Sequence, residues 1–364
     1  MPQDKIEDKK KVQNIALSYY SMKDVQKAIL EFSKNREIIP QYLEGFGKRP
    51  DVIEYESDVL QLVKNGATSL HCSEELWQNP LSLSTELNTE ELNDLRVGWD
   101  LLIDIDSKYL DYSKVAAKLI LQALEFNGLK NYGLKFSGNK GFHILIPWKA
   151  FPEKLYEHET KNMFPEWARI IVLYLKEQIE KPLINEISKF SLESKYVKDF
   201  SAVKEVIPDL ILVSSRHLFR MPYSLHEKTA LSSVVLEKSE IGAFNPRDAE
   251  AFKVKIRSFM PESRENEAKE LLIQALDWYK EANKEEKKKD YSGKKFEVID
   301  NKYITEDMFP PVIKNILQGV KSDGRKRALF VLITFFRSLG FSDDYINKTI
   351  NEWNNKNYKP LKQG

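Results

Sequence analysis

The sequence predicts a mixed α/β (α+β) fold followed by a small all-α domain. Three observations lead to this class. An apolar strand over residues 97–106 is followed by an amphipathic helix over 112–125. Two further strands, 132–137 and 142–148, flank a short glycine-containing turn. After about residue 260 the apolar pattern is only helical. A strand–helix–strand–strand order is typical of a mixed sheet that carries a site on its face.

The remaining elements follow from apolar spacing and from turn residues. On the N-terminal side we expect a helix over 11–46, then turns and short strands over 46–77. Beyond the central strands we expect a helix over 164–182, strands over 210–213 and 232–236, a charged helix over 262–283 and a solvated linker over 281–295. Three helices complete the tail, 313–320, 325–339 and 343–355, the last with Ser342 as its N-terminal cap.

Composition limits the class of protein. The 364 residues are 42% hydrophobic and 30% charged, which suits one large or two ordinary domains. No apolar run is long enough to cross a membrane and the N-terminal residues are polar, so we expect a cytoplasmic protein. The single cysteine, Cys72, excludes an internal disulfide framework and any site built from several cysteines. The balance of 56 basic and 55 acidic residues neither supports nor excludes nucleic-acid binding.

The first chemical motif is LLIDIDS, residues 101–107. Asp104 and Asp106 are separated by one residue on a strand, so their carboxylates share a face and can hold a divalent cation between them. The rest of the strand is apolar, and burying two acids without a compensating cation costs several kcal/mol each. The alternative is a chance Asp-X-Asp pair in a solvated position.

The second motif is the turn SGNKGFH, which begins at Ser137. Gly138 and Gly141 let backbone N–H groups approach an anion, Ser137 offers a hydroxyl, and Lys140 supplies positive charge. His143 lies two residues into the next strand. The turn therefore suits a phosphate, although a β-hairpin with a surface lysine explains the same letters.

The third motif is HLFRMPYSLHEKT, residues 217–229. Arg220 and His226 flank Pro222, so an extended segment presents cationic side chains in succession, as binding of a triphosphate requires. The alternative is a surface loop after a strand, in which Lys228 is simply solvated.

These motifs, in this order, resemble those of the archaeo-eukaryotic primase superfamily, specifically the small catalytic subunit of archaeal primases. The first family motif is matched by Asp104 and Asp106. The second is matched by Ser137, Gly138, Gly141 and His143. The third is matched by Arg220, Pro222, Ser224, Leu225, His226, Lys228 and Thr229. The likeness is specific over roughly residues 95–230.

The resemblance implies roles for these residues. Asp104, Asp106 and an upstream aspartate, for which Asp209 is the candidate, would be the catalytic residues and bind two Mg²⁺ or Mn²⁺ ions. The residues implied to bind the nucleotide are Ser137, Gly138, Lys140, Gly141, His143, Arg220, Ser224, His226 and Lys228.

Other basic residues are candidates for contacts with the template or the initiating nucleotide. The Arg36-Glu37 pair is like one that the family places near its site, and Lys48 and Arg49 follow it. In the tail, Arg325 and Arg327 are the corresponding candidates. Ordinary salt bridges, or a solvated basic start of a helix, explain these residues equally well.

Two departures from the family concern metals other than the catalytic ions. Residues 107–135 contain no cysteine or histidine, so we expect no structural zinc. The tail is similar to the C-terminal domain of the primase large subunit, but Val312 stands where a cysteine commonly follows the paired prolines, so we expect no iron–sulfur cluster. The resulting division is a primase catalytic domain over 1–258, a charged helix and linker over 259–300, and a large-subunit-like helical domain over 301–364.

The resemblance implies a DNA primase that synthesises short primers de novo on single-stranded DNA from nucleoside triphosphates. Its partners would be the template, the nucleotides and a large or accessory subunit, with no membrane. Two alternatives stay open: a repair or gap-filling polymerase of the same superfamily, and a non-catalytic subunit that only binds template. A metal-dependent glycosyltransferase also uses Asp-X-Asp, but it would leave the second and third motifs unexplained.

Overall fold

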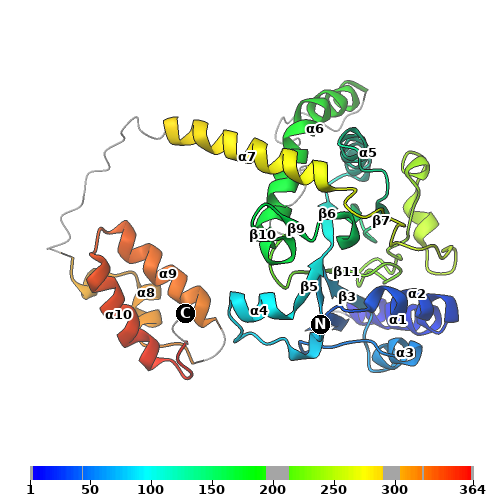
Figure 1. The fold of residues 1–364 in the computed structure, drawn as a ribbon. Coiled ribbons are helices and arrows are strands. Elements are labelled where there is room, and N and C mark those ends of the chain that lie inside the picture. Colours follow the sequence, from blue (N-terminus) through cyan, green and yellow to red (C-terminus); the bar gives the residue numbers. More distant parts are fainter. Residues whose placement is uncertain (1–2, 43, 194–212, 290–303, 322–323, 362–364) are drawn as a thin grey trace. The chain divides into compact units, whose positions relative to one another are not determined.

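The computed structural model describes residues 3–42, 44–193, 213–289, 304–321 and 324–361. The chain divides into two compact units, Met1–Glu286 and Lys287–Gly364, each with its own apolar core. The first unit combines short antiparallel sheets with helices, and the second is helical (Figure 1). The predicted α/β (α+β) class with a helical C-terminal domain is confirmed, but the strand pairs of the described residues are antiparallel, whereas a mixed sheet was predicted.

The N-terminal region contains two helices and a hairpin in place of the single helix predicted over 11–46. Helix α1 spans Gln3–Tyr20 and α2 spans Lys23–Ser33. Strands β1 (Ile38–Tyr42) and β2 (Gly45–Phe46) follow. The prediction fails there because β-branched isoleucines favour a strand and Pro40 cannot continue a helix.

A four-stranded antiparallel sheet has the strand order β11-β3-β1-β2. Strand β3 spans Ser69–Ser73, after helix α3 (Glu56–Lys64), and β11 spans Leu218–Arg220. The neighbours β3 and β11 lie about 150 residues apart in sequence. Their pairing places the third motif in the same sheet as the N-terminal hairpin, with β3 between them.

The strand predicted over 97–106 is two strands in two different sheets. Strand β5 (Arg96–Trp99), which follows helix α4 (Thr89–Leu95), pairs with β4 (Glu75–Trp77). Strand β6 (Leu101–Ile105) pairs with β8. Asp100 separates them, and its buried carboxylate accepts hydrogen bonds from the Trp148 N–H, at 2.6 Å, and from Arg36. These two bonds fix the change of sheet, which apolar spacing does not reveal.

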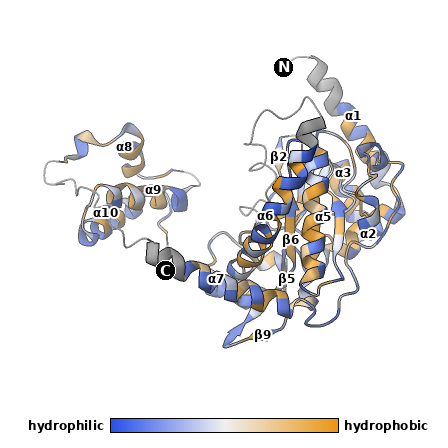
Figure 2. Cartoon of the chain, turned by 90° about the horizontal axis from the view of Figure 1, so that it is seen from above, coloured by the Kyte–Doolittle hydropathy of each residue, from blue (hydrophilic) through white to orange (hydrophobic). Residues whose placement is uncertain are grey.

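The predicted central strands and helix are confirmed with small shifts of their ends. A three-stranded antiparallel sheet has the order β6-β8-β7, with β7 at Gly133–Phe136 and β8 at Phe142–Ile146. Helix α5 (Leu110–Phe126) packs against this sheet. Helix α5 and strand β6 are mostly hydrophobic in Figure 2, consistent with their places in the core.

The remaining elements of the first unit are a small hairpin and two long helices. They are β9 (Lys154–Leu155), β10 (His158–Glu159), α6 (Glu166–Glu193) and α7 (Lys269–Lys289). Helix α6 starts close to the predicted position and continues past Pro182. The segment predicted as a strand over 232–236 forms only isolated bridges, although the Phe136 N–H donates to Val234 O at 2.9 Å. Of the strand predicted over 210–213, residues 210–212 lie outside the described residues.

The charged helix is shifted relative to the prediction. Helix α7 begins at Lys269 and continues through residue 289, so residues 281–289 of the expected linker are helical. Leu271, Leu272 and Ala275 anchor its first half in the core of the first unit. Amphipathic spacing at its start, rather than composition, decides its conformation.

The second unit has the three predicted helices: α8 (Pro311–Leu317), α9 (Arg325–Ser338) and α10 (Asp343–Lys356). Its core includes Phe309, Leu332, Phe336 and Trp353. The Ser342 side chain accepts a hydrogen bond from the Tyr345 N–H, as a cap should. Nowhere in the described parts of the chain is a helix long and apolar enough to span a bilayer.

Candidate nucleotide site

The three motifs meet at the turn between β7 and β8. A β-carbon at Gly141 would collide with the carbonyl oxygen of Ile105, at the end of the first motif. On the other side, a β-carbon at Gly138 would lie 3.0 Å from Cβ of His226, and the Thr229 hydroxyl donates to the Gly138 carbonyl at 2.8 Å. The second motif is thus wedged between the first and the third, and its glycines are needed for that approach.

The acidic pair sits at the end of β6. Asp104 lies within the strand with its side chain 19% exposed, and Asp106 lies one residue beyond the strand and is exposed. Although the residue is exposed, partial desolvation of its carboxyl raises the pKa of Asp106, while the Ser107 N–H and the charge of Lys140 oppose this rise. A cation beside the pair would offset this cost in the same way as Lys140.

A buried lysine lies beside the acidic pair. The strand register sets Asp104, His143 and Lys135 abreast on adjacent strands. His143 Nε2 is 3.5 Å from Asp104 Oδ1, and His143 Nδ1 is 2.9 Å from Lys135 Nζ. Lys135 Nζ also donates to Ser233 Oγ at 2.7 Å. When Lys135 carries its ammonium charge it can only donate, so that Nδ1 accepts and the imidazole proton lies on Nε2, facing Asp104.

Burial is the main cause of the pKa shifts of Lys135 and His143. Burial, followed by the charge of Arg220, lowers the pKa of Lys135 well below its usual range. Burial, followed by Lys135 and Arg220, lowers the pKa of His143 well below its usual range. His143 is therefore a neutral, buried ring that lies between Lys135 and Asp104. Its contact with a phosphate stays a prediction.

Arg220 connects the second motif, the third motif and strand β3. Its Nε donates to Ser137 O at 3.1 Å, and its other nitrogens donate to Leu225 O, to Ser69 Oγ and to Glu227 Oε2, the last at 2.8 Å. Its side chain is only 11% exposed. The carboxylate of Glu227 therefore occupies the place at Arg220 that an anionic ligand would take.

The other predicted nucleotide residues differ in their surroundings. Lys140 and Lys228 are exposed, and the hydroxyl of Ser137 accepts from the Gly141 N–H at 3.1 Å. Burial, followed by the charge of Arg220, lowers the pKa of His226 to about 4, so its ring is neutral near pH 7. Ser224 is fully buried, and its hydroxyl accepts from the Leu70 N–H at 2.7 Å. Its contacts hold β3, and its role toward a nucleotide stays a prediction.

The prediction for Arg36 is corrected by the structure. Its side chain is 2% exposed and donates to Asp100, to Phe32 O at 3.1 Å and to Ser73 O at 2.9 Å. A guanidinium enclosed in this way holds the fold together and does not reach a template.

The remaining predicted contacts lie on the surface or outside the described residues. Arg49 donates to the buried Glu37, while Lys48 is exposed. In the second unit Arg327 is exposed and Arg325 donates to Lys359 O. Asp209 lies outside the described residues.

Sequence reasoning missed two residues of this cluster, Lys135 and His71. A lysine within the otherwise apolar strand 132–137 was a usable signal for Lys135. His71 lies opposite Arg220 in the β3–β11 register, is buried, and its Nδ1 has no hydrogen-bond partner among the described residues. No local sequence pattern predicts that His71 belongs to the cluster, because its position there depends on the pairing of β3 with β11.

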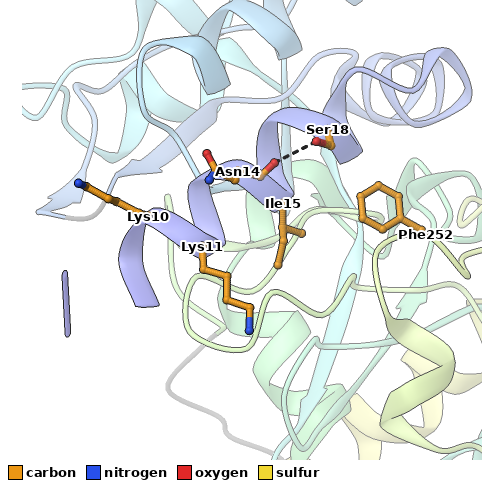
Figure 3. Close-up of a pocket in the computed structure, with 6 residues that line it drawn as sticks. All are labelled: Lys10, Lys11, Asn14, Ile15, Ser18 and Phe252. Atoms are coloured by element: carbon orange, nitrogen blue, oxygen red, sulfur yellow. Dashed lines mark hydrogen bonds between the residues drawn. The ribbon is translucent and has the colours of Figure 1, made fainter. Parts of the chain in front are cut away.

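A separate groove lies on α1 and contains none of the predicted residues. Lys10, Lys11, Asn14, Ile15 and Ser18 of α1 line it together with Phe252 (Figure 3). Its volume is about 490 Å³. The motif cluster and this groove are therefore distinct features of the first unit.

Comparison with known proteins shows what this cluster is similar to. Residues 103–237, which contain Asp104 and Asp106 and the whole of the second and third motifs, match the family model for the DNA primase small subunit. An uncharacterized protein of Methanocaldococcus jannaschii is 23% identical, with 88% of this chain and 75% of that protein aligned. The DNA primase small subunit PriS of Archaeoglobus fulgidus is 26% identical, and the match covers 43% of this chain and 59% of that subunit.

Among solved structures, the polymerase domain of ligase D from Mycobacterium tuberculosis, in complex with DNA, aligns with a TM-score of 0.42 and 14% identity. That alignment covers 73% of this chain and 88% of the domain. The region that holds the three motifs is therefore similar to the DNA primase small subunit, in its family model and in a curated relative.

Proposed function

We propose that this protein is a DNA primase, a nucleotidyltransferase that starts short primers on single-stranded DNA from nucleoside triphosphates. The similarity of residues 103–237 to the DNA primase small subunit supports the reaction class. The observation that carries the proposal is the wedged turn of the second motif, with Gly141 against Ile105 and Gly138 against His226. This packing holds acids and phosphate-binding groups in one cluster, as transfer between phosphates requires.

The acids at the end of β6 suit a divalent cation. Carboxylate oxygens are the ligands that Mg²⁺ and Mn²⁺ prefer, and the raised pKa of Asp106 reflects a burial cost that a cation would offset. Within the described ranges no group of three or more acidic, histidine or cysteine residues could hold a metal. We propose Asp209 as the third ligand. Two bound ions would lower the pKa of an attacking hydroxyl and stabilise the leaving pyrophosphate.

The other residues of the cluster would position the nucleotide. Lys140, Ser137 and Arg220 would bind the phosphates, with neutral His226 beside them. Glu227 must leave Arg220 before a phosphate can take its place. The buried Lys135–His143 pair would keep Asp104 in place and orient it from the neighbouring strand.

The division of the chain into domains and the contacts with the template remain proposals. We propose that residues 1–258 form the catalytic domain, that 259–300 connect it, and that 301–364 act as a template-binding module like that of a large subunit. Arg325 and Arg327 would contribute to template binding there, and Lys48 and Arg49 would contribute from the first unit. Deleting residues 301–364 should then weaken binding of single-stranded DNA.

The central experiment is synthesis on unprimed single-stranded DNA by the purified chain, with ribo- or deoxynucleotides and Mg²⁺ or Mn²⁺. New dinucleotides and longer products are expected. The double variant Asp104→Asn and Asp106→Asn should keep the thermal transition of the wild type and make no product, since its amides bind divalent cations poorly. Undiminished synthesis by the double variant would overturn the mechanism.

Two further outcomes separate the alternatives. Extension of a primed template without any start on unprimed DNA would identify a gap-filling polymerase. Binding of template without incorporation under either condition would identify a non-catalytic subunit.

A further inference from the structure

An exposed aromatic side chain lies next to the proposed nucleotide site. Phe46, in β2, is 57% exposed, and its ring packs edge to face against His71 with 5.1 Å between ring centres. A singly exposed aromatic residue is common on protein surfaces. Phe46 stands apart because its contact is a buried member of the site cluster.

The register of the four-stranded sheet places Phe46 on the same face as the phosphate-binding arginine. Phe46 pairs with Gln41, Gln41 pairs with Ser69, and His71 pairs with Arg220. Paired residues, and residues two apart on one strand, share a face of a sheet. The guanidinium of Arg220 lies over this face, because it donates to Ser69 Oγ.

The residues of this face connect the proposed phosphate-binding end of the sheet, at Arg220, with the aromatic ring of Phe46, and we call this face the floor of the site. Arg220 on β11 and Phe46 on β2 are separated by three strand spacings of about 4.8 Å each. An extended nucleoside triphosphate covers such a distance. Between the two ends lies His71, whose buried Nδ1 lacks a partner among the described residues. An unsatisfied buried nitrogen on this floor is consistent with a ligand that binds there.

We propose that Phe46 is the platform on which the base of the bound nucleoside triphosphate stacks. This inference rests on the proposed function, because it takes the phosphates to lie at Arg220. The ring would contact the flat face of any base, so it would add affinity without selecting among bases. A nucleotide base is favoured over a template base because the floor leads from the ring directly to the phosphate-binding group.

Binding measurements on the full chain test this role without requiring synthesis. Three variants are needed: Phe46→Ala, Phe46→Trp and the control Phe126→Ala. Phe126 is 85% exposed and is the last residue of α5, roughly 24 Å along that helix from the end that follows Asp106. Calorimetry with Ca²⁺ and no template would measure the affinity for ATP and UTP. Inorganic tripolyphosphate, which has no base, is the second probe.

Phe46→Ala should bind both nucleotides about tenfold more weakly and should bind tripolyphosphate like the wild type. Phe46→Trp should restore nucleotide binding, and Phe126→Ala should change neither affinity. Equal nucleotide affinity of Phe46→Ala and the wild type would overturn the inference alone.

Three other results would also contradict it. If Phe46→Ala lost affinity for single-stranded DNA and kept its affinity for nucleotides, the ring would contact the template. If the wild type bound tripolyphosphate and nucleotides equally well, no base would be bound and the inference would fail while the proposed function stood. A wild type that bound no nucleotide at all would remove the proposed function as well.

Discussion

Arg36 and Arg220 are similar in sequence context and different in structure. Both are arginines in segments that resemble motifs of the primase family, and both were predicted to contact ligands. Arg36 pairs with Asp100, whose side chain is as buried as its own. Arg220 pairs with Glu227, which lies in a loop and is 20% exposed. The partner, rather than the arginine, decides whether the charge can serve a ligand.

The physical reason lies in the cost of separating the two charges. Removing either partner of a buried pair leaves an unpaired charge in a medium of low dielectric constant, so the pair cannot exchange partners. Glu227 is less enclosed than Asp100, and in the proposed function an incoming phosphate would replace its carboxylate, so that Arg220 would not be left unpaired. Arg36 is therefore fixed in a structural role, while the pair of Arg220 with Glu227 is the one that we propose to exchange.

The largest effect is expected when the buried guanidinium of Arg36 is removed. Arg36→Ala should lower the free energy of unfolding by about 3–5 kcal/mol, because Asp100 is left charged and unpaired. The half-exposed Arg49→Ala is the matched control, with a loss of about 1 kcal/mol, since Glu37 keeps its bond to Arg216. Denaturation in urea measures both. Equal losses of unfolding free energy in the two variants would show that burial of an arginine does not determine how much its ion pair stabilises the fold.

A smaller effect is expected at the exchangeable pair. Glu227→Gln should bind nucleotide about fivefold more tightly, because a charged competitor for Arg220 is removed. The exposed Glu250→Gln, whose side chain pairs with Lys253, should leave the affinity unchanged. Titration with ATP and Ca²⁺ provides the comparison. Weaker nucleotide binding by Glu227→Gln would mean that the carboxylate supports the site instead of occupying it.

The smallest effect concerns pH. The pKa of His226 is about 4 in the folded chain and about 6.5 in an unfolded one, so the unfolded state binds more protons between these values. As the pH falls through this window, the free energy of unfolding of the wild type falls, because the unfolded state gains protons that the folded state does not. The His226→Asn variant has no titrating group at this position and keeps that stability. The stability difference between wild type and variant should therefore be smaller at pH 4.5 than at pH 7.5. A constant difference would place His226 in an environment like that of water.

The extent of prediction differs from element to element. Helix α5 and strands β7 and β8 were predicted because their apolar spacing continues without interruption to a turn that glycines define. The split at Asp100 and the hairpin at Ile38 were missed. In both cases the decisive bonds run to residues that lie far away in the sequence.

By itself the sequence determined the fold class, the three motifs and their likeness to a known family, since each depends on residues within a few positions of one another. Only the tertiary structure decided which charged residues are free to act. It enclosed Arg36, placed Lys135 against His143, and placed His71 opposite Arg220 and in contact with Phe46. Burial and strand register fix these roles, and both arise from contacts between segments that the local pattern does not connect.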